Sequence, residues 1–361
     1  MSVNPTSDNP TSDNPMSDNP VFVRNAWYVA AWDHEIGRAP FARTILGEPI
    51  VLYRKEDGGI VALEDRCCHR FLPLSKGEVK GDCLQCGYHG MVYDGTGACV
   101  EIPWQDAIPS AARVRAYPVV ERHKWVWIWM GAAEDANPDE ITDFHWLDDS
   151  GWGAKGTRFH VGCDYRLIVE NLLDLTHLAY VHRSTIGNDA VAEAAAVTFE
   201  RSKNGVTVTR WTLDQPPPPT YAKAGDFKGN VDRWQIIHFT PPCFVRLDVG
   251  ACEAGTGAPE GQRKGGIRMR NLNAITPENE KSTHYFWAQA HDFDVGNAAV
   301  TDMVFQQVKT AFGEDVAVFE AQQAAIDRDP GASMLDLSHD AGGIAACKMI
   351  ERLAQAEIRS R

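Results

Sequence analysis

The sequence lacks any run of about 18 apolar residues, the length that a membrane-spanning helix requires. Its first residues also lack the basic and apolar blocks of a secretory signal peptide. These absences predict a cytoplasmic protein with no membrane partner. Positive charge is scarce as well, because 35 lysines and arginines stand against 49 aspartates and glutamates, for a net charge of -14. Such an acidic surface repels phosphate groups, so we expect no nucleic-acid partner.

Cysteine content and length narrow the class of protein further. Nine cysteines are an odd number, which suits free thiols or metal ligands in a reducing compartment better than a disulfide framework. The 361 residues predict two domains, each with enough chain for its own core. Residues 4–20 repeat Asn, Pro, Thr, Ser and Asp, with Met16 as the one apolar side chain. We therefore expect residues 1–20 to be a disordered tail.

The segment from residue 21 to about residue 130 alternates short apolar runs with turn residues, which predicts antiparallel strands. Trp125, Trp127 and Trp129 alternate with other apolar residues, so this strand is expected to be buried on both faces. An acidic, loop-rich stretch follows over residues 131–156. We place the domain boundary there, with a β domain over residues 21–140 and a second domain over residues 141–361.

Two loops of the first domain contain candidate metal ligands. Residues 66–70 contain Cys67-x-His69, and after sixteen intervening residues the second loop contains Cys86-x2-His89. Each loop thus offers one thiolate and one imidazole. A Rieske [2Fe-2S] cluster requires this set, because one iron takes two cysteines and the other takes two histidines.

A zinc site is the rival interpretation of the same segment. Cys83 and Cys86 form a C-x2-C pair, which Cys67, Cys68 or His69 could complete. The spacing and the glycines after the second-loop ligands favour the Rieske interpretation. Under that interpretation, Cys83 is a buried thiol and Cys68 binds no metal.

A polar stripe interrupts an otherwise apolar helical pattern over residues 169–182. Asn171, Asp174, His177 and His182 fall within an arc of about 140° on a helix. Two histidines and a carboxylate are the ligand set of non-haem Fe(II) sites that activate oxygen. The two histidines are five residues apart, so sharing an ion requires a π-type bulge or a break in the helix.

The rest of the second domain is expected to supply strands and the missing carboxylate. Residues 197–212 predict a hairpin, and residues 215–230 form a Pro- and Gly-rich loop that is either a plain surface loop or a lid. A long helix is predicted over residues 298–326, where Glu314 and Asp315 are both candidate ligands. Further strands are predicted over residues 234–239, 244–249, 267–275 and 284–290.

The two loops, together with the D-x2-H-x4-H pattern from Asp174 to His182, resemble the oxygenase (alpha) component of the Rieske non-haem iron oxygenases. The similarity runs from RNAWYVAAW, which begins at Arg24, to DAGGI, which begins at Asp340, and is nearest to the vanillate O-demethylase oxygenase group. Dicamba monooxygenase and toluenesulfonate methyl-monooxygenase are relatives of that group. One departure is Cys68, where the family usually has proline.

The resemblance implies an α+β fold, with a helix-grip catalytic domain of antiparallel sheet and helices after the Rieske domain. It implies that His177, His182 and Asp315 bind a mononuclear Fe(II), while Glu314 faces solvent. In the family, Asp174 forms a bridge to a Rieske histidine of the next subunit in a head-to-tail trimer, which here would be His89. A lesser role for Asp174 is to orient His177 alone, and Asn171 is expected to support the same network.

The resemblance also implies the activity. Electrons from NADH pass through a partner reductase with a flavin and a ferredoxin-type cluster, and O2 then oxidises an aromatic acid. The first hypothesis is O-demethylation of vanillate or a similar methoxybenzoate; hydroxylation of an aryl methyl group or of another aromatic acid is the second. A non-catalytic iron–sulfur carrier and a zinc-stabilised binding module are the alternatives from other classes. Candidates for holding the substrate carboxylate are Arg233, Arg246, Arg268 and His291.

Overall fold

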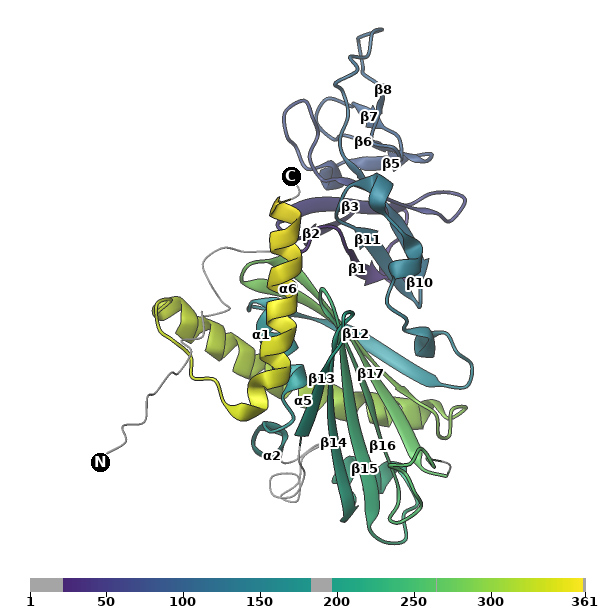
Figure 1. The fold of residues 1–361 in the computed structure, drawn as a ribbon. Coiled ribbons are helices and arrows are strands. Elements are labelled where there is room, and N and C mark those ends of the chain that lie inside the picture. The colour runs from purple at the N-terminus through teal and green to yellow at the C-terminus, as the bar shows by residue number, and fades with distance from the viewer. Residues whose placement is uncertain (1–21, 183–196, 264, 360–361) are drawn as a thin grey trace, which may run out of the picture.

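The computed structural model describes residues 22–182, 197–263 and 265–359, so the tail predicted over residues 1–20 lies outside the described residues. Three small antiparallel sheets form the N-terminal part, in agreement with the predicted β domain (Figure 1). The first sheet has the order β1(Trp27–Trp32), β11(Trp125–Trp129), β10(Val119–Arg122). The second is β2(Phe41–Ile45), β3(Glu48–Arg54), β4(Ile60–Glu64), β9(Ala116–Tyr117), and the third is β5(Glu78–Lys80), β6(Cys83–Gln85), β7(Val92–Tyr93), β8(Cys99–Glu101).

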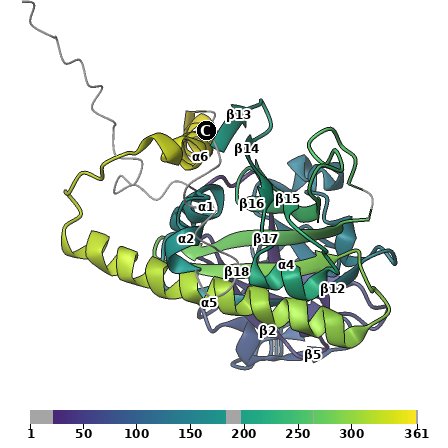
Figure 2. The same cartoon turned by 90° about the horizontal axis from the view of Figure 1, so that it is seen from below.

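The C-terminal part is one antiparallel sheet of seven strands covered by helices (Figures 1 and 2). This arrangement confirms the predicted α+β class. The strands follow the order β12(Gly153–Val161), β18(Ser282–His291), β17(Ile267–Asn279), β16(Phe244–Glu253), β15(Val231–Thr240), β14(Val206–Gln215), β13(Val197–Arg201). The helices are α1(Tyr165–Leu173), α2(Leu178–Val181), α4(Pro219–Ala224), α5(Ala298–Arg328) and α6(Ala341–Arg359). Short 3-10 turns are η1(Asp33–Glu35), η2(Leu74–Lys76), η3(Ala133–Asp135), η4(Pro138–Glu140), η5(His145–Leu147) and η6(Ser338–Asp340).

The tryptophan strand β11 joins the two parts. All five of its residues are buried, as its sequence predicts, and it lies between β1 and β10. The Trp127 ring packs against Phe244 of β16 at a centroid distance of 5.3 Å. Thr276 of β17 donates a hydrogen bond to the backbone oxygen of Val29 in β1. One hydrophobic core therefore runs from the first small sheet into the large sheet.

Helix α5 runs along the large sheet and contacts β12 and β18 (Figure 2). Its N-terminus is capped by Asn297, whose side-chain oxygen accepts a hydrogen bond from the backbone N–H of Ala299. Its buried residues include Phe312, Asp315 and Phe319, so a carboxylate points from this helix into the core. No helix among the described residues is long and apolar enough to cross a bilayer.

Candidate metal centres

The two cysteine–histidine loops share one backbone pattern. The N–H of Cys67 donates to the oxygen of Leu72, and the N–H of Phe71 donates back to Cys67. In the second loop, the N–H of Cys86 donates to Met91, and that of Gly90 donates to Cys86. Phe71 and Gly90, the fifth residues of these turns, both have positive φ, at 61° and 74°. A glycine adopts this conformation without strain, whereas a phenylalanine rarely does.

In both loops, the cysteine and the histidine lie in different environments. Cys67 and Cys86 are each 2% exposed, in the small core beneath the loops. His69 and His89 are exposed at the loop tips, with ring centroids 4.5 Å apart. Two buried thiols and two adjacent outer imidazoles match the donors that a Rieske cluster needs, one pair for each iron. The residues therefore fit a [2Fe-2S] cluster.

The zinc interpretation finds no support in the arrangement of Cys83. In the part of the chain that the structure describes, Cys83 joins no group of three converging metal donors. The prediction that Cys83 is a buried thiol is wrong, because its side chain is only partly buried on β6. Strand β6 is a three-residue strand with β5 on one side and β7 on the other, and it leaves Cys83 at its outer end.

Three donors converge beneath the large sheet. One ligand atom each from His177, His182 and Asp315 lies within 4.8 Å of the other two. The Nε2 atoms of His177 and His182 lie 3.8 Å and 3.1 Å from Asp315 Oδ1. His182 and Asp315 are buried, and the His177 side chain is 16% exposed. Two imidazoles and one carboxylate on one side of a small space fit a mononuclear iron that keeps open positions.

The π-type bulge or break predicted between the two histidines is wrong, because His177 and His182 lie at the two ends of one short helix, α2, and the break in the helical pattern comes before His177. Helix α1 ends at Leu173, and α2 begins at Leu178. Between them, Asp174 Oδ1 accepts hydrogen bonds from the N–H and the hydroxyl of Thr176, both at 2.7 Å. An aspartate that bonds the backbone two residues ahead competes with the helix. This turn separates α1 from α2, and the two histidines reach the site from the N-cap and C-cap positions of α2.

A second carboxylate lies behind each histidine. Asp174 Oδ2 is 3.6 Å from His177 Nδ1, just beyond hydrogen-bond distance. Burial alone would raise the pKa of Asp174, but His177 and the Thr176 donors hold it at about 2. Glu314 Oε2 lies 2.8 Å from His182 Nδ1. Burial acts to lower the pKa of His182, but Asp315 and Glu314 together raise it above the ordinary value.

The expectation that Glu314 faces solvent is therefore wrong. Its side chain is 28% exposed and reaches inward to the imidazole of His182. The adjacent side chains of Glu314 and Asp315 thus approach the two nitrogens of one imidazole ring. Carboxylates in this position fix the tautomer and orientation of a metal-ligating histidine. The sequence indicated both acidic residues as candidate metal ligands. Because they are adjacent, it did not show which one binds the metal and which one holds the histidine in place.

Asn171 joins the same network. Its side-chain N–H donates to Asp315 Oδ1 at 3.4 Å, a long hydrogen bond. Its side-chain oxygen is buried with no hydrogen-bond partner among the described residues. Asn171 also lines the space beside the three donors, together with Asp174. The structure thus places all five predicted residues of the second domain around one point.

A largely apolar cavity adjoins the three donors. Arg233, Gln235, Asn271 and Gln289 supply its polar lining. The side-chain oxygens of Asn271 and Gln289 are buried without a hydrogen-bond partner among the described residues. Unpaired buried amides are costly, so a bound molecule that pairs with them is stabilised. The apolar lining includes Leu178, Tyr221, Ile237, Leu247, Met269 and Phe312.

Of the four cations proposed to hold a substrate carboxylate, Arg233 alone lines this cavity in the described part of the chain. Its guanidinium lies over the Tyr221 ring at 4.7 Å. Arg246 instead lies over the Trp146 ring, and Arg268 forms an ion pair with Asp292. The buried His291 side chain bonds to Phe293 O and the Thr301 hydroxyl.

Helix α4, which carries Tyr221, lies within the loop predicted over residues 215–230. The sequence suggested either a plain surface loop or a lid there. Tyr221 is 2% exposed and lines the cavity beside Arg233. The loop therefore forms one wall of the candidate site.

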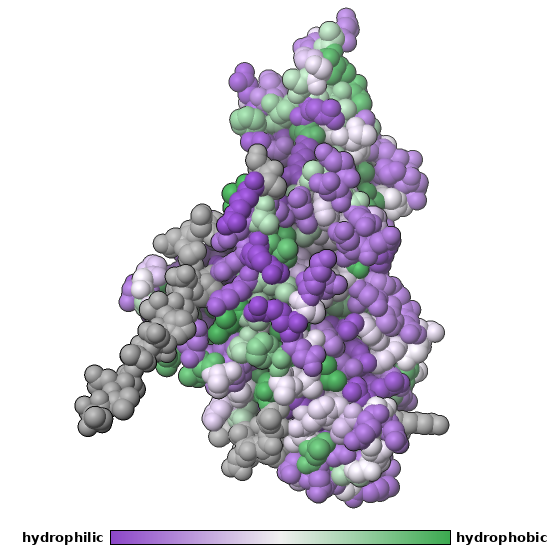
Figure 3. All heavy atoms as spheres, in the orientation of Figure 1, coloured by the Kyte–Doolittle hydropathy of each residue, from purple (hydrophilic) through white to green (hydrophobic). Residues whose placement is uncertain are grey.

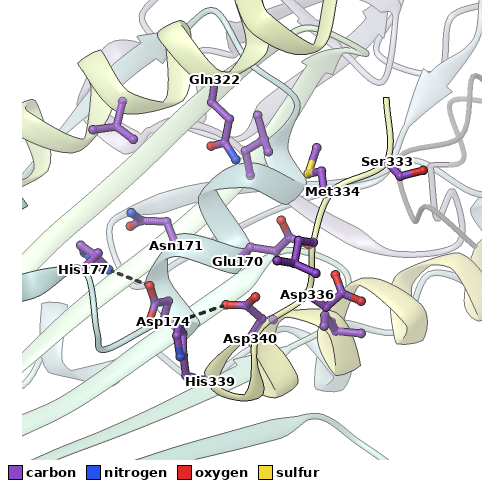
Figure 4. Close-up of a pocket in the computed structure, with 15 residues that line it drawn as sticks. Glu170, Asn171, Asp174, His177, Gln322, Ser333, Met334, Asp336, His339 and Asp340 are labelled. Carbon is purple, nitrogen blue, oxygen red and sulfur yellow. Dashed lines mark ion pairs between the residues drawn. The ribbon is translucent and has the colours of Figure 1, made fainter. Parts of the chain in front are cut away.

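A second pocket opens beside Asp174, between α1, α5 and the chain that leads into α6, and its lining includes several carboxylates (Figure 4). Asp174 and Glu170 come from the α1 segment, whereas Asp336 and Asp340 come from the chain before α6. Burial raises the pKa of Glu170 to about 7, although Cys347 and Arg166 act to lower it. This carboxyl consequently holds its proton over the acidic pH range.

Glu170→Gln is expected to raise stability at pH 8 but not at pH 4.5. A carboxyl whose pKa rises from 4.5 to about 7 on folding binds its proton more tightly in the folded state. The free energy of unfolding therefore falls as the pH rises through that interval. Glutamine has no charge to bury, so the gain at pH 8 is roughly 1–3 kcal/mol. Thermal unfolding at both pH values measures it, and an equal gain at both would contradict the assignment.

Two protein families match the chain, one in its N-terminal part and one in its C-terminal part. The family model of the Rieske [2Fe-2S] domain matches residues 26–118, and that of the vanillate O-demethylase oxygenase C-terminal domain matches residues 161–356. The chain is 44% identical to the iron–sulfur subunit of the toluene-4-sulfonate monooxygenase system of Comamonas testosteroni, over 93% of this chain and 98% of that protein. It is 37% identical to the vanillate O-demethylase oxygenase subunit of a Pseudomonas species, over 93% and 96%.

A solved structure agrees with these matches. Dicamba monooxygenase bound to 3,6-dichlorosalicylic acid superposes with a TM-score of 0.87 at 34% identity, covering 94% of this chain and 99% of that one. The two loops lie within the first matched range, and the three converging donors lie within the second. The chain therefore belongs to the Rieske non-haem iron oxygenases, with a Rieske [2Fe-2S] domain followed by a vanillate O-demethylase oxygenase C-terminal domain.

Proposed function

We propose that Cys67, His69, Cys86 and His89 hold the [2Fe-2S] cluster of this oxygenase, and that His177, His182 and Asp315 hold its mononuclear iron. The buried thiols and outer imidazoles support the first assignment. The convergence of the three donors supports the second. Glu314 and Asp174 orient the two histidines from behind, so that each ring presents Nε2 to the metal.

The proposed reaction is oxidation of a methyl group on an aromatic acid, in the first instance O-demethylation of vanillate or a similar methoxybenzoate. The observation that carries it is the apolar cavity beside the three donors, with a guanidinium and two unpaired amide oxygens in its wall. When bound, the iron supplies activation of O2. The sum is ArOCH3 + O2 + NADH + H+ giving ArOH + HCHO + NAD+ + H2O, because the hydroxylated methoxy group collapses to phenol and formaldehyde.

The residues of the cavity bind and orient such a substrate. Arg233 is the cation in its wall and pairs with the substrate carboxylate. The side-chain oxygens of Asn271 and Gln289 accept a hydrogen bond from a phenolic hydroxyl such as that of vanillate, which satisfies buried acceptors. The apolar walls accept the ring and exclude water from the reacting methyl group.

Electrons are proposed to reach the iron from the cluster of a neighbouring subunit in a homotrimer. Figure 1 places strands β5 to β8 at one end of the molecule and α2 near the other, so the two centres of one chain lie far apart. His89 is exposed at the loop tip, and Asp174 lines an open pocket beside His177. Asp174 would accept a hydrogen bond from His89 of the next copy. A reductase with flavin and a ferredoxin-type cluster supplies the electrons from NADH.

Hydroxylation of an aryl methyl group is the second candidate. It is favoured by the higher identity to the toluene-4-sulfonate monooxygenase subunit, 44% against 37% for the vanillate O-demethylase subunit. Its balance is ArCH3 + O2 + NADH + H+ giving ArCH2OH + NAD+ + H2O. Arg233 would then pair with a sulfonate or carboxylate in the same way.

Turnover assays with a reductase, NADH and O2 distinguish the candidates. Vanillate and other methoxybenzoates are compared with toluene-4-sulfonate and toluates, and formaldehyde and benzylic alcohols are both measured. Formaldehyde in equal amount to the phenol supports O-demethylation, whereas a benzylic alcohol without formaldehyde supports the second candidate. Arg233→Met should raise KM for the acids far more than for their uncharged amides. No product from any aromatic acid would contradict the proposed substrate class.

A further inference from the structure

A buried phenol lies between two thiols at the cluster loops. Tyr93, at the end of β7, is 0% exposed in the small core beneath the loops. Its hydroxyl oxygen lies 3.2 Å from Cys67 Sγ and 3.2 Å from Cys68 Sγ. The thioether sulfur of Met91 is farther away, at 3.8 Å. The Tyr93 hydroxyl therefore has two sulfur partners at equal distance, only one of which is a proposed cluster ligand.

The chemistry of the three groups fixes the direction of these hydrogen bonds once the cluster is bound. Cys67 is then a thiolate, which has no proton and can only accept. Tyr93 has a single O–H, and a charged acceptor attracts it more strongly than the neutral thioether of Met91 does. The phenol oxygen is left free to accept, and the S–H of Cys68 is a donor within reach.

We infer that the Cys68 thiol donates to the Tyr93 hydroxyl and strengthens the hydrogen bond from Tyr93 to Cys67, so that Cys68 raises the reduction potential of the Rieske cluster through a relay, S–H to O–H to S. The inference rests on the proposed assignment of Cys67 as a ligand. A donor to a ligand sulfur stabilises the reduced cluster more than the oxidised one, because the reduced cluster has more negative charge on its sulfurs. The bond from Cys68 polarises the phenol and strengthens its own donation.

The relay gives Cys68 a role that its position alone does not suggest. Its thiol is a donor directed at the phenol rather than at the cluster. Cys68 is partly buried, so solvent does not fully compete for its thiol.

Redox titration of the holoenzyme, followed by the EPR signal of the reduced cluster, tests the relay. Tyr93→Phe removes only the hydroxyl and should shift the midpoint potential to a more negative value. Cys68→Ala should shift it in the same direction by a smaller amount. The double variant should match Tyr93→Phe alone, because Cys68 acts only through the phenol. Cys83→Ala, which removes another partly buried thiol of this region, should leave the potential unchanged.

The outcomes separate the relay from the assignment of the cluster. Iron and sulfide content is measured on every sample, so a wild-type protein without a cluster would overturn the proposed function itself. Clusters present in all variants, with Cys68→Ala at the wild-type potential, would overturn the relay alone. A Cys68→Ala shift that persists in the Tyr93→Phe background would also overturn it, because Cys68 would then act on the cluster directly.

Discussion

Replacing Asp315 with alanine is expected to empty the mononuclear iron site while leaving the [2Fe-2S] cluster in place. Asp315 supplies the one carboxylate of the three converging donors, and its Oδ1 is the atom that both histidines face. Without it, the remaining imidazoles form an incomplete and neutral ligand set. Iron affinity should fall by more than the roughly 10–100-fold that loss of a supporting residue costs. Iron analysis together with the cluster spectrum measures both sites on one sample.

Glu314→Gln is the matched control, because Glu314 precedes Asp315 on α5 and contacts the other nitrogen of His182. Glutamine keeps an oxygen for the hydrogen bond but loses the charge that supports the imidazole. Iron affinity should therefore fall by about 10-fold and recover at higher Fe(II) concentration. Iron retained at wild-type affinity in Asp315→Ala and lost in Glu314→Gln would reverse the two roles.

Asp174→Asn is expected to leave both metal centres loaded and to stop electron transfer between them. Asparagine has the same shape and can still accept from the Thr176 N–H, so the turn between α1 and α2 is kept. It has no charge to pair with a ligand histidine of another subunit. Electron transfer from a prereduced cluster should slow by roughly 100-fold or more. Single-turnover kinetics under O2 with substrate present measure that rate.

Asp302→Asn is a suitable control for that experiment, since Asp302 pairs with Lys155 at the surface and lines none of the pockets near the iron site. It should transfer electrons at the wild-type rate. Full turnover in Asp174→Asn would refute the bridge between subunits and leave Asp174 the lesser role of orienting His177.

Large aromatic side chains are exposed on the turns of the two cysteine–histidine loops and just after β8. Figure 3 shows hydrophobic and hydrophilic residues mixed at the β5 to β8 end of the molecule. Phe71, Tyr88 and Trp104 are 64%, 62% and 105% exposed. Exposed apolar patches mark interaction surfaces, whereas single exposed apolar side chains are common on any protein.

Local chemistry made much of the fold and site predictable. The alternation of Trp125, Trp127 and Trp129 specified a strand buried on both faces, and β11 has that burial. The five-residue spacing of His177 and His182 was harder to interpret, because an ideal helix would separate them. They converge without the predicted break between them, since they lie at the N-cap and C-cap positions of the short helix α2 and His182 no longer has helical φ and ψ.

Tertiary placement explains what the sequence could not reveal. Glu314 and Asp315 are neighbours on α5, and their roles depend on which nitrogen of His182 each approaches. Likewise, the sequence did not distinguish among four candidates for binding the substrate carboxylate. The structure shows that Arg233 lies on a strand of the large sheet and lines the cavity. Cys83 was expected to be a buried thiol because the Rieske interpretation gives it no metal to bind, yet β6 is short and leaves it partly exposed. Such distinctions follow from contacts between distant segments, which spacing does not encode.

The most direct test of the account is the metal content of anaerobically purified protein, with visible spectra before and after dithionite. A Rieske cluster and a mononuclear site together predict about three irons and two sulfides per chain and a red-brown colour that bleaches on reduction. A colourless protein that contains zinc in place of iron and sulfide would contradict the account.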